Sequence, residues 1–121
     1  MVFPSTVKDG IGTIRVTGKL MGRPPTETLH KRVKVLIERG IPWIIVDLGD
    51  LEWMNSQGIG ALMTCVTSAR NAGGELVVAR PGRRVNSIFM VSQVVKLFTI
   101  APSIKVAREG LIALRDVVPD A

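Results

Sequence analysis

The segment from Trp43 to Leu48 constrains the fold most, because it is almost continuously apolar and β-branched. A strand exposed on one face alternates apolar and polar residues, so an uninterrupted run predicts a central strand covered on both faces. Segments with helical spacing flank it, one over residues 29–37 and one over Gln57 to Asn71. This alternation predicts an α/β fold with crossover connections and a mostly parallel sheet.

The other segments extend the pattern in both directions. Asp9-Gly10 is a hairpin signal between residues 5–8 and 11–17, and the alternation in the second arm places Ile14 and Val16 on the buried face. Thr26, after two prolines, is the predicted N-cap of the first helix. Four later elements are predicted: a strand over 75–79, a helix over 83–92, a short strand over 103–106 and a helix over 108–118. Residues 1–121 are therefore interpreted as one domain, with a mixed sheet of about five strands and about four helices.

Size and composition limit the class of protein. The chain has 121 residues, 46% of them apolar, which is enough for one packed core. No apolar run approaches the roughly 18 residues that a membrane span requires, and the first residues do not resemble a secretory signal. Cys65 is the only cysteine, so no internal disulfide can form. We expect a soluble, cytoplasmic protein without a membrane span.

The formal charge of +6 raises the question of a nucleic-acid partner. The basic residues are scattered along the chain, and only two adjacent pairs occur, Lys31-Arg32 and Arg83-Arg84. A nucleic-acid-binding domain usually shows a denser basic stripe or a recognisable module. The pattern favours a solvated basic face and no direct contact with nucleic acid.

Signatures of catalysis are scarce. His30 is the only histidine and is expected to be exposed on the first helix, so no metal-ligand set or catalytic triad is indicated. Gly58 to Gly60 lacks both the dinucleotide fingerprint and the lysine of a phosphate-binding loop. Cys65 is interpreted as a small buried hydrophobe. Three carboxylates near the end of the central strand are assigned to turns and solubility: Asp47, Asp50 and Glu52. The prediction is a protein that is not an enzyme and holds no cofactor or metal.

The joint between the central strand and the second helix carries the most information. Ser56 falls at the start of that helix, where free backbone N–H groups and the helix dipole favour an anion. A phosphoryl group there would add about −1.5 to −2 charges. Gly58, Gly60 and Ala61 follow, and their small side chains would let a partner approach the helix closely. The plainer alternative is that Asn55 or Ser56 only caps the helix and the glycines only permit tight packing.

The chain resembles the anti-sigma factor antagonist, or STAS domain, family over nearly its whole length. The segments that carry the resemblance, in order, are Val16 to Leu20, Ile44 to Leu48, Met54 to Leu62, Asn71 to Val78, Val85 to Phe89 and Val95 to Phe98. The resemblance implies a partner-switching protein that binds an anti-sigma factor with serine kinase activity. It implies that this kinase phosphorylates Ser56 and that a phosphatase reverses the modification. The implied partner surface comprises Asn55, Gln57, Gly58 and Ala61, together with Gly18, Lys19 and Arg23 of the loop from Gly18 to Arg23.

Three departures from the family pattern keep alternatives open. Asn55 stands where the family usually has Asp, Gln57 replaces a second serine, and Met21-Gly22-Arg23 replaces an acidic position. One alternative is a scaffold or sensory STAS module in a larger signalling assembly, with Ser56 unmodified. Another is a domain that binds a nucleotide or other small ligand, or a cryptic enzyme. The scarcity of histidine and of metal-ligand sets disfavours the second alternative.

Overall fold

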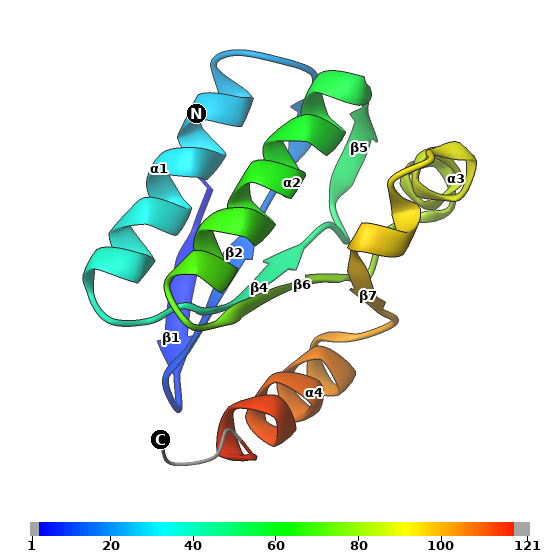
Figure 1. Ribbon diagram of the computed structural model, residues 1–121. Helices are drawn as coiled ribbons and strands as arrows, with labels where there is room; N and C mark the ends of the chain where they lie inside the picture. The colour runs from blue at the N-terminus through cyan, green and yellow to red at the C-terminus, as the bar shows by residue number, and fades with distance from the viewer. Residues whose placement is uncertain (1–2, 118–121) are drawn as a thin grey trace.

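The computed structural model describes residues 3–117. The elements follow one another as strands alternating with helices (Figure 1): β1 (Ser5–Lys8), β2 (Ile11–Arg15), β3 (Gly18–Leu20), α1 (Pro25–Glu38), β4 (Trp43–Asp47), β5 (Leu51–Met54), α2 (Ser56–Asn71), β6 (Glu75–Ala79), α3 (Arg83–Val91), the 3-10 helix η1 (Val95–Leu97), β7 (Thr99–Ala101) and α4 (Ile104–Asp116). The fold is the predicted single α/β domain with four α-helices and a mixed sheet of five strands.

The main sheet has the strand order β1-β2-β4-β6-β7. The hairpin strand β1 is antiparallel to β2, and every other pair in this sheet is parallel. The register aligns Ile14 with Val46 and Val46 with Val78, so one row of β-branched side chains crosses the centre of the sheet. The predicted N-terminal hairpin and the predicted central strand are both confirmed.

Helices cover both faces of this sheet, as the composition of β4 requires. α1 and α2 lie side by side on one face and α4 lies on the other (Figure 1). Ile44 and Val46 point into the core beneath α1 and α2, whereas Ile45 joins the core beneath α4. Ile14 and Val16 are buried in the first of these cores, as predicted.

A second, two-stranded parallel sheet is formed by β3 and β5 and was not predicted. Its strands have three and four residues, and within residues 3–117 each pairs with the other alone. Because β3 covers Gly18 to Leu20, part of the predicted loop is a strand. This small sheet supports the start of α2 and packs against α3.

The predictions for the last helix, the last strand and the cap of the first helix were wrong. The last helix begins at Ile104 rather than Arg108, and its predicted end at residue 118 lies outside the described residues. The predicted strand over 103–106 does not exist, because the Ser103 hydroxyl accepts a hydrogen bond from the Val106 N–H and caps α4. The last strand is β7, which lies just before this cap. The predicted N-cap Thr26 lies inside α1, whose N-cap is Pro24. Proline is favoured in the first turn of a helix, where its missing N–H has no partner to lose.

Candidate switch site at the start of helix α2

The candidate site lies where β5 leads into α2, at one end of the small sheet. Asn55 has an extended backbone and is the N-cap of α2. Its side-chain oxygen accepts hydrogen bonds from the N–H groups of Gln57, at 3.0 Å, and Gly58, at 3.2 Å. The expectation that Asn55 or Ser56 caps this helix is confirmed for Asn55, whereas Ser56 makes no capping hydrogen bond.

Ser56 is the first residue of α2 and is exposed. Its hydroxyl forms no side-chain hydrogen bond with any residue in the range 3–117. Two of the backbone N–H groups expected to be free for an anion are already bound by Asn55. What remains at Ser56 is an accessible hydroxyl in the positive field of the helix dipole.

Gly58 and Ala61 do not lie on the open surface that the sequence suggested. Both are buried, and a Cβ atom at Gly58 would lie 2.2 Å from the backbone oxygen of Leu20. The absent side chain at Gly58 therefore lets α2 pack against β3. Gly60 is exposed and has no neighbouring atom within 4 Å of a Cβ placed there, so it is the glycine that leaves space for a partner.

Two other predicted site residues meet beside this helix start. Arg23 and Gln57 line a hollow of about 430 Å³, together with Gly22, Thr26, His30, Gly60, Ala61 and Thr64. Both Arg23 and Gln57 are exposed. Lys19 is also exposed and pairs with Trp53 across the small sheet, whereas Gly18 lies at the far end of β3. The structure thus groups Arg23 and Gln57 around the hollow and leaves Gly18 apart from it.

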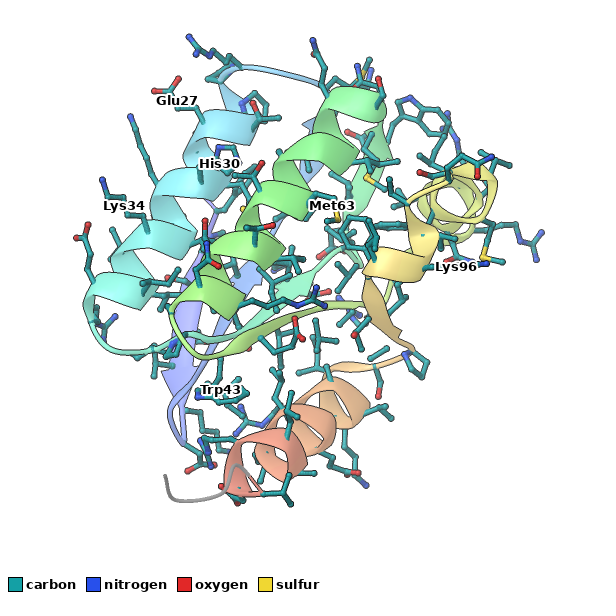
Figure 2. The ribbon with its side chains drawn as sticks, viewed as in Figure 1. Glu27, His30, Lys34, Trp43, Met63 and Lys96 are labelled. Atoms are coloured by element: carbon teal, nitrogen blue, oxygen red, sulfur yellow. The ribbon has the colours of Figure 1, made fainter. Side chains whose placement is uncertain are left out.

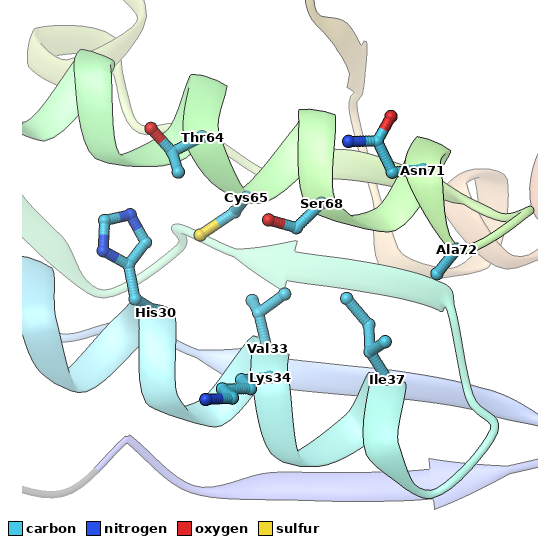
Figure 3. A pocket seen from close by; sticks show the side chains of 9 residues that line it. All are labelled: His30, Val33, Lys34, Ile37, Thr64, Cys65, Ser68, Asn71 and Ala72. Atoms are coloured by element: carbon cyan, nitrogen blue, oxygen red, sulfur yellow. The ribbon is translucent and has the colours of Figure 1, made fainter.

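A second groove, of about 550 Å³, runs between α1 and α2 and shares His30 and Thr64 with the hollow. Figure 3 shows His30, Val33 and Ile37 of α1 across from Thr64, Cys65 and Ser68 of α2. His30 is half-buried rather than exposed, which corrects the prediction, and its Nε2 lies 3.2 Å from the Ala61 carbonyl oxygen. Burial raises the pKa of the Cys65 thiol to about 12, consistent with its prediction as a buried apolar residue.

The turn role expected for Asp47 is confirmed by the hydrogen bond that its carboxylate accepts from the Gly49 N–H, but the solubility role is wrong because the side chain is buried and ion-paired. It is 7% exposed, and its carboxylate accepts hydrogen bonds from Arg80 Nε and the Gly49 N–H, each at 2.9 Å. The hydrogen bond and the charge of Asp47 raise the pKa of Arg80 above its ordinary value. An acid at the end of an otherwise apolar strand was the available signal for this pair. Asp50, by contrast, forms an exposed ion pair with Arg15.

Sequence reasoning also missed the contact that joins β5 to α3. The guanidinium carbon of Arg84 lies 5.0 Å from the ring centroid of Trp53, within the range of a cation–π interaction. Trp53 is only three residues before Ser56. No short-range sequence pattern links Trp53 to Arg84, because the contact depends on how α3 packs against the small sheet.

Residues 3–117 were also searched for a membrane-spanning helix and for a metal-binding cluster. No helix within residues 3–117 is both long enough and apolar enough to cross a bilayer. Over the same residues, no three side chains of the metal-binding types gather at one point.

Comparisons with known proteins agree with the observed fold. The sequence model of the STAS domain family matches residues 3–107. BtrV, a candidate anti-sigma factor antagonist of Bordetella bronchiseptica, is 26% identical over 77 residues, which is 64% of this chain and 66% of BtrV. The chain therefore matches slightly less than two thirds of that relative's length.

Solved structures share the fold at lower identity. The crystal structure of the candidate anti-sigma factor antagonist TM1081 from Thermotoga maritima has a TM-score of 0.81 and 20% identity, covering 91% of this chain and 94% of TM1081. Phosphorylated SpoIIAA from Bacillus has a TM-score of 0.67 and 19% identity, covering 90% of this chain and 98% of SpoIIAA. The family match spans most of the chain and agrees with the observed order of strands and helices. The chain belongs to the STAS domain family.

Proposed function

We propose that the chain is an anti-sigma factor antagonist, a non-enzymatic protein that binds an anti-sigma factor and changes partner when Ser56 is phosphorylated. The observation that carries the proposal is the uncommitted Ser56 hydroxyl at the exposed first position of α2. Asn55 satisfies the helix start by itself, so modification of Ser56 would not remove the cap.

The relatives support the same function. BtrV is named as a candidate anti-sigma factor antagonist, and SpoIIAA has been solved in both unphosphorylated and phosphorylated forms. In the proposed cycle, an anti-sigma factor with serine kinase activity binds the unmodified chain and transfers the γ-phosphoryl group of ATP to the Ser56 oxygen. ADP leaves, the serine proton is released, and a phosphatase later hydrolyses the phosphate ester. The cycle takes place in the cytoplasm, where ATP and sigma factors are found.

The physical reason for the switch is a change of charge on a small, open surface. The modified serine would carry about −1.5 to −2 charges beside Gln57 and the open position at Gly60. A partner fitted to the uncharged surface would have to accommodate both the volume and the charge of the phosphoryl group. We therefore expect the unmodified chain to bind the anti-sigma factor more tightly.

The test is phosphorylation by each purified serine-kinase anti-sigma factor from the same genome, followed by intact-mass measurement. We expect one phosphoryl group on the wild type and none on Ser56→Ala. Ser87→Ala is the matched control, because Ser87 is also an exposed helical serine and should not affect labelling. Ser56→Asp should bind the kinase about tenfold more weakly or worse. Unchanged labelling of Ser56→Ala, or no labelling of the wild type by any such kinase, would overturn the proposal.

A scaffold or sensory STAS module is the second candidate, and the neutral cap Asn55 favours it. The family resemblance places an aspartate at this position, and an amide cannot accept a proton from the neighbouring hydroxyl. Under this alternative, size-exclusion chromatography with light scattering would show the chain in a large assembly, with no phosphate on Ser56. A one-to-one complex that dissociates on addition of ATP would instead favour the antagonist.

A further inference from the structure

The positive charge of the chain is concentrated in one segment. Six of the 16 basic residues and none of the ten acidic residues lie between Leu76 and Arg108, so the formal charge of +6 resides there. The rest of the chain carries equal numbers of both signs. This segment contains α3 and η1, which pack beside the small sheet (Figure 1).

Three of these six cations are paired with carboxylates from other elements or from their own helix. Arg80 pairs with Asp47, Arg108 with Asp9 and Lys105 with Glu109. The other three are Arg83, Arg84 and Lys96, and no carboxylate among residues 3–117 lies within ion-pair distance of them. All three are exposed, and Lys96 lies near α3 in Figure 2.

The same segment exposes apolar side chains. Met90 is 66% exposed, Val91 is 79% exposed and Leu97 is 48% exposed. Within α3, the helical spacing from Arg83 and Arg84 to Met90 and Val91 brings these four onto the outward side, since Val85 and Phe89 face the core. We call the following six residues the α3 surface: Arg83, Arg84, Met90, Val91, Lys96 and Leu97.

The α3 surface adjoins the candidate switch site. The Arg84 guanidinium carbon lies 5.0 Å from the ring centroid of Trp53, and Trp53 belongs to the strand that ends just before Asn55. Trp53 is partly exposed. A protein that covers Ser56 and extends over β5 would therefore meet Arg84 first and the rest of the α3 surface next.

From this arrangement we propose that the α3 surface is the docking site for an acidic protein surface with an apolar centre. We further propose that the partner covering Ser56 makes this contact, a second step that rests on the proposed function. Arginine, methionine and tryptophan are enriched at protein interfaces, where apolar side chains form the core and charges form the rim. A partner that covers this surface would have to place negative charge opposite the unpaired cations and apolar surface against Met90 and Val91.

Other anionic surfaces fit less well. A single acyl chain gives only marginal membrane binding, and three exposed apolar side chains with three cations supply no more than that. Nucleic acid offers phosphates but no apolar surface for Met90, Val91 and Leu97. Three phosphate contacts would also give only weak, strongly salt-dependent binding. A protein surface can offer both carboxylates to the three cations and apolar side chains to Met90, Val91 and Leu97.

The first experiment uses a defined probe. A synthetic amphipathic helix with glutamates flanking a leucine stripe is titrated into the isotope-labelled full chain and followed by NMR. We expect shifts confined to Trp53 and residues 83–97, and binding about fivefold to tenfold weaker in the double variant Arg83→Gln/Arg84→Gln. The control Lys8→Gln/Arg39→Gln makes the same charge change at exposed positions near the opposite ends of the strands, where neither residue pairs with a carboxylate of residues 3–117, and should bind like the wild type.

Three further binding experiments test a membrane, a nucleic acid and a second copy of the chain as ligands of the α3 surface. Vesicles of phosphatidylcholine with phosphatidylserine, a DNA duplex, and the chain itself at high concentration in sedimentation velocity are tested with the same variants. Tighter binding of the vesicles or the duplex than of the peptide, or self-association that depends on Arg83 and Arg84, would overturn the proposal. Peptide shifts located away from α3 would do the same.

A second experiment separates this proposal from the proposed function. The kinase that labels Ser56 is titrated with the wild type and both double variants at low and high salt. Weaker binding of Arg83→Gln/Arg84→Gln, with reduced salt dependence, supports the shared partner, and equal binding of all three proteins overturns it. If no kinase labels Ser56, the proposed function fails, while the peptide titration still decides whether the α3 surface binds acidic protein.

Discussion

Two glycines in the first turns of α2 give matched variants that test how this helix is positioned. Gly58→Ala adds a methyl group that would lie 2.2 Å from the Leu20 carbonyl oxygen and 3.0 Å from Met54 Cβ. Gly60→Ala adds the same group two residues later, where no atom lies within 4 Å. Both changes replace glycine by alanine inside the same helix, so they share the gain in helix propensity.

The two substitutions are expected to change the free energy of unfolding in opposite directions. Alanine is favoured over glycine in a helix interior by about 1 kcal/mol, so Gly60→Ala should stabilise the protein by up to about that amount. Overpacking costs about 1–3 kcal/mol, and the upper end applies to Gly58 because the obstacle is backbone, which cannot rotate away. Subtracting the helix gain leaves a net destabilisation of about 2 kcal/mol for Gly58→Ala.

Urea unfolding followed by circular dichroism measures both variants, and thermal unfolding gives an independent value. A difference of about 3 kcal/mol between the variants corresponds to a gap of roughly 12 °C in Tm for a chain of this size. Equal stabilities, or a more stable Gly58→Ala, would refute the argument that Gly58 exists for close packing of α2 on β3. Either result would also favour the original expectation that Gly58 is one of the small residues that contact a partner.

Two further predictions concern groups that the switch does not use. Asp47→Asn and Arg80→Gln should each lower the free energy of unfolding by about 1–2 kcal/mol, discounted because the Arg80 side chain is 43% exposed. The double variant should lose less than the sum, and additive losses in a double-mutant cycle would show that the pair is not coupled. Cys65, with its pKa raised to about 12, should react slowly with a thiol reagent at pH 8 and rapidly in urea. Because the folded pKa lies above the unfolded one, this thiol should favour folding fully below about pH 8.5 and progressively less up to about pH 12. Rapid labelling of the folded chain would contradict this burial.

Four of the five strands of the main sheet, β1, β2, β4 and β6, were predictable because local sequence determines them. The apolar run from Trp43 to Leu48 must be covered on two sides, and the structure places α1 and α2 on one face and α4 on the other. The hairpin at Asp9-Gly10 has its own turn signal and both residues adopt positive φ angles, which such turns require. Each of these elements is determined by residues that lie within it or next to it in the sequence.

The small sheet and the end of the chain were not predictable by the same route. β3 has three residues, and it is a strand only because it pairs with β5, about thirty residues later. The segment after Ser103 reads equally as strand or helix, and the capping hydroxyl of Ser103 decides the outcome. The Asp47–Arg80 and Trp53–Arg84 contacts likewise join residues about thirty positions apart.

The position of Ser56 was predictable, whereas the surface around it was not. The sequence placed the serine at the start of α2 but could not decide which residue caps the helix or which glycines face outward. Asn55 accepts hydrogen bonds from the amides of Gln57 and Gly58, and Gly58 is buried against Leu20. Both outcomes depend on how β3 lies against the helix, and β3 is the element that local sequence did not reveal.

The two proposals together give the switch a direction. A partner with an acidic surface would be drawn to the unpaired charges of Arg83 and Arg84 while Ser56 is unmodified. Phosphorylation adds about −1.5 to −2 charges three residues from Trp53, on which Arg84 is stacked. The phosphoryl group would repel the partner's carboxylates and partly neutralise the cation that attracts them. Both effects weaken the complex, so a basic α3 surface makes phosphorylation at Ser56 a release signal rather than a binding signal.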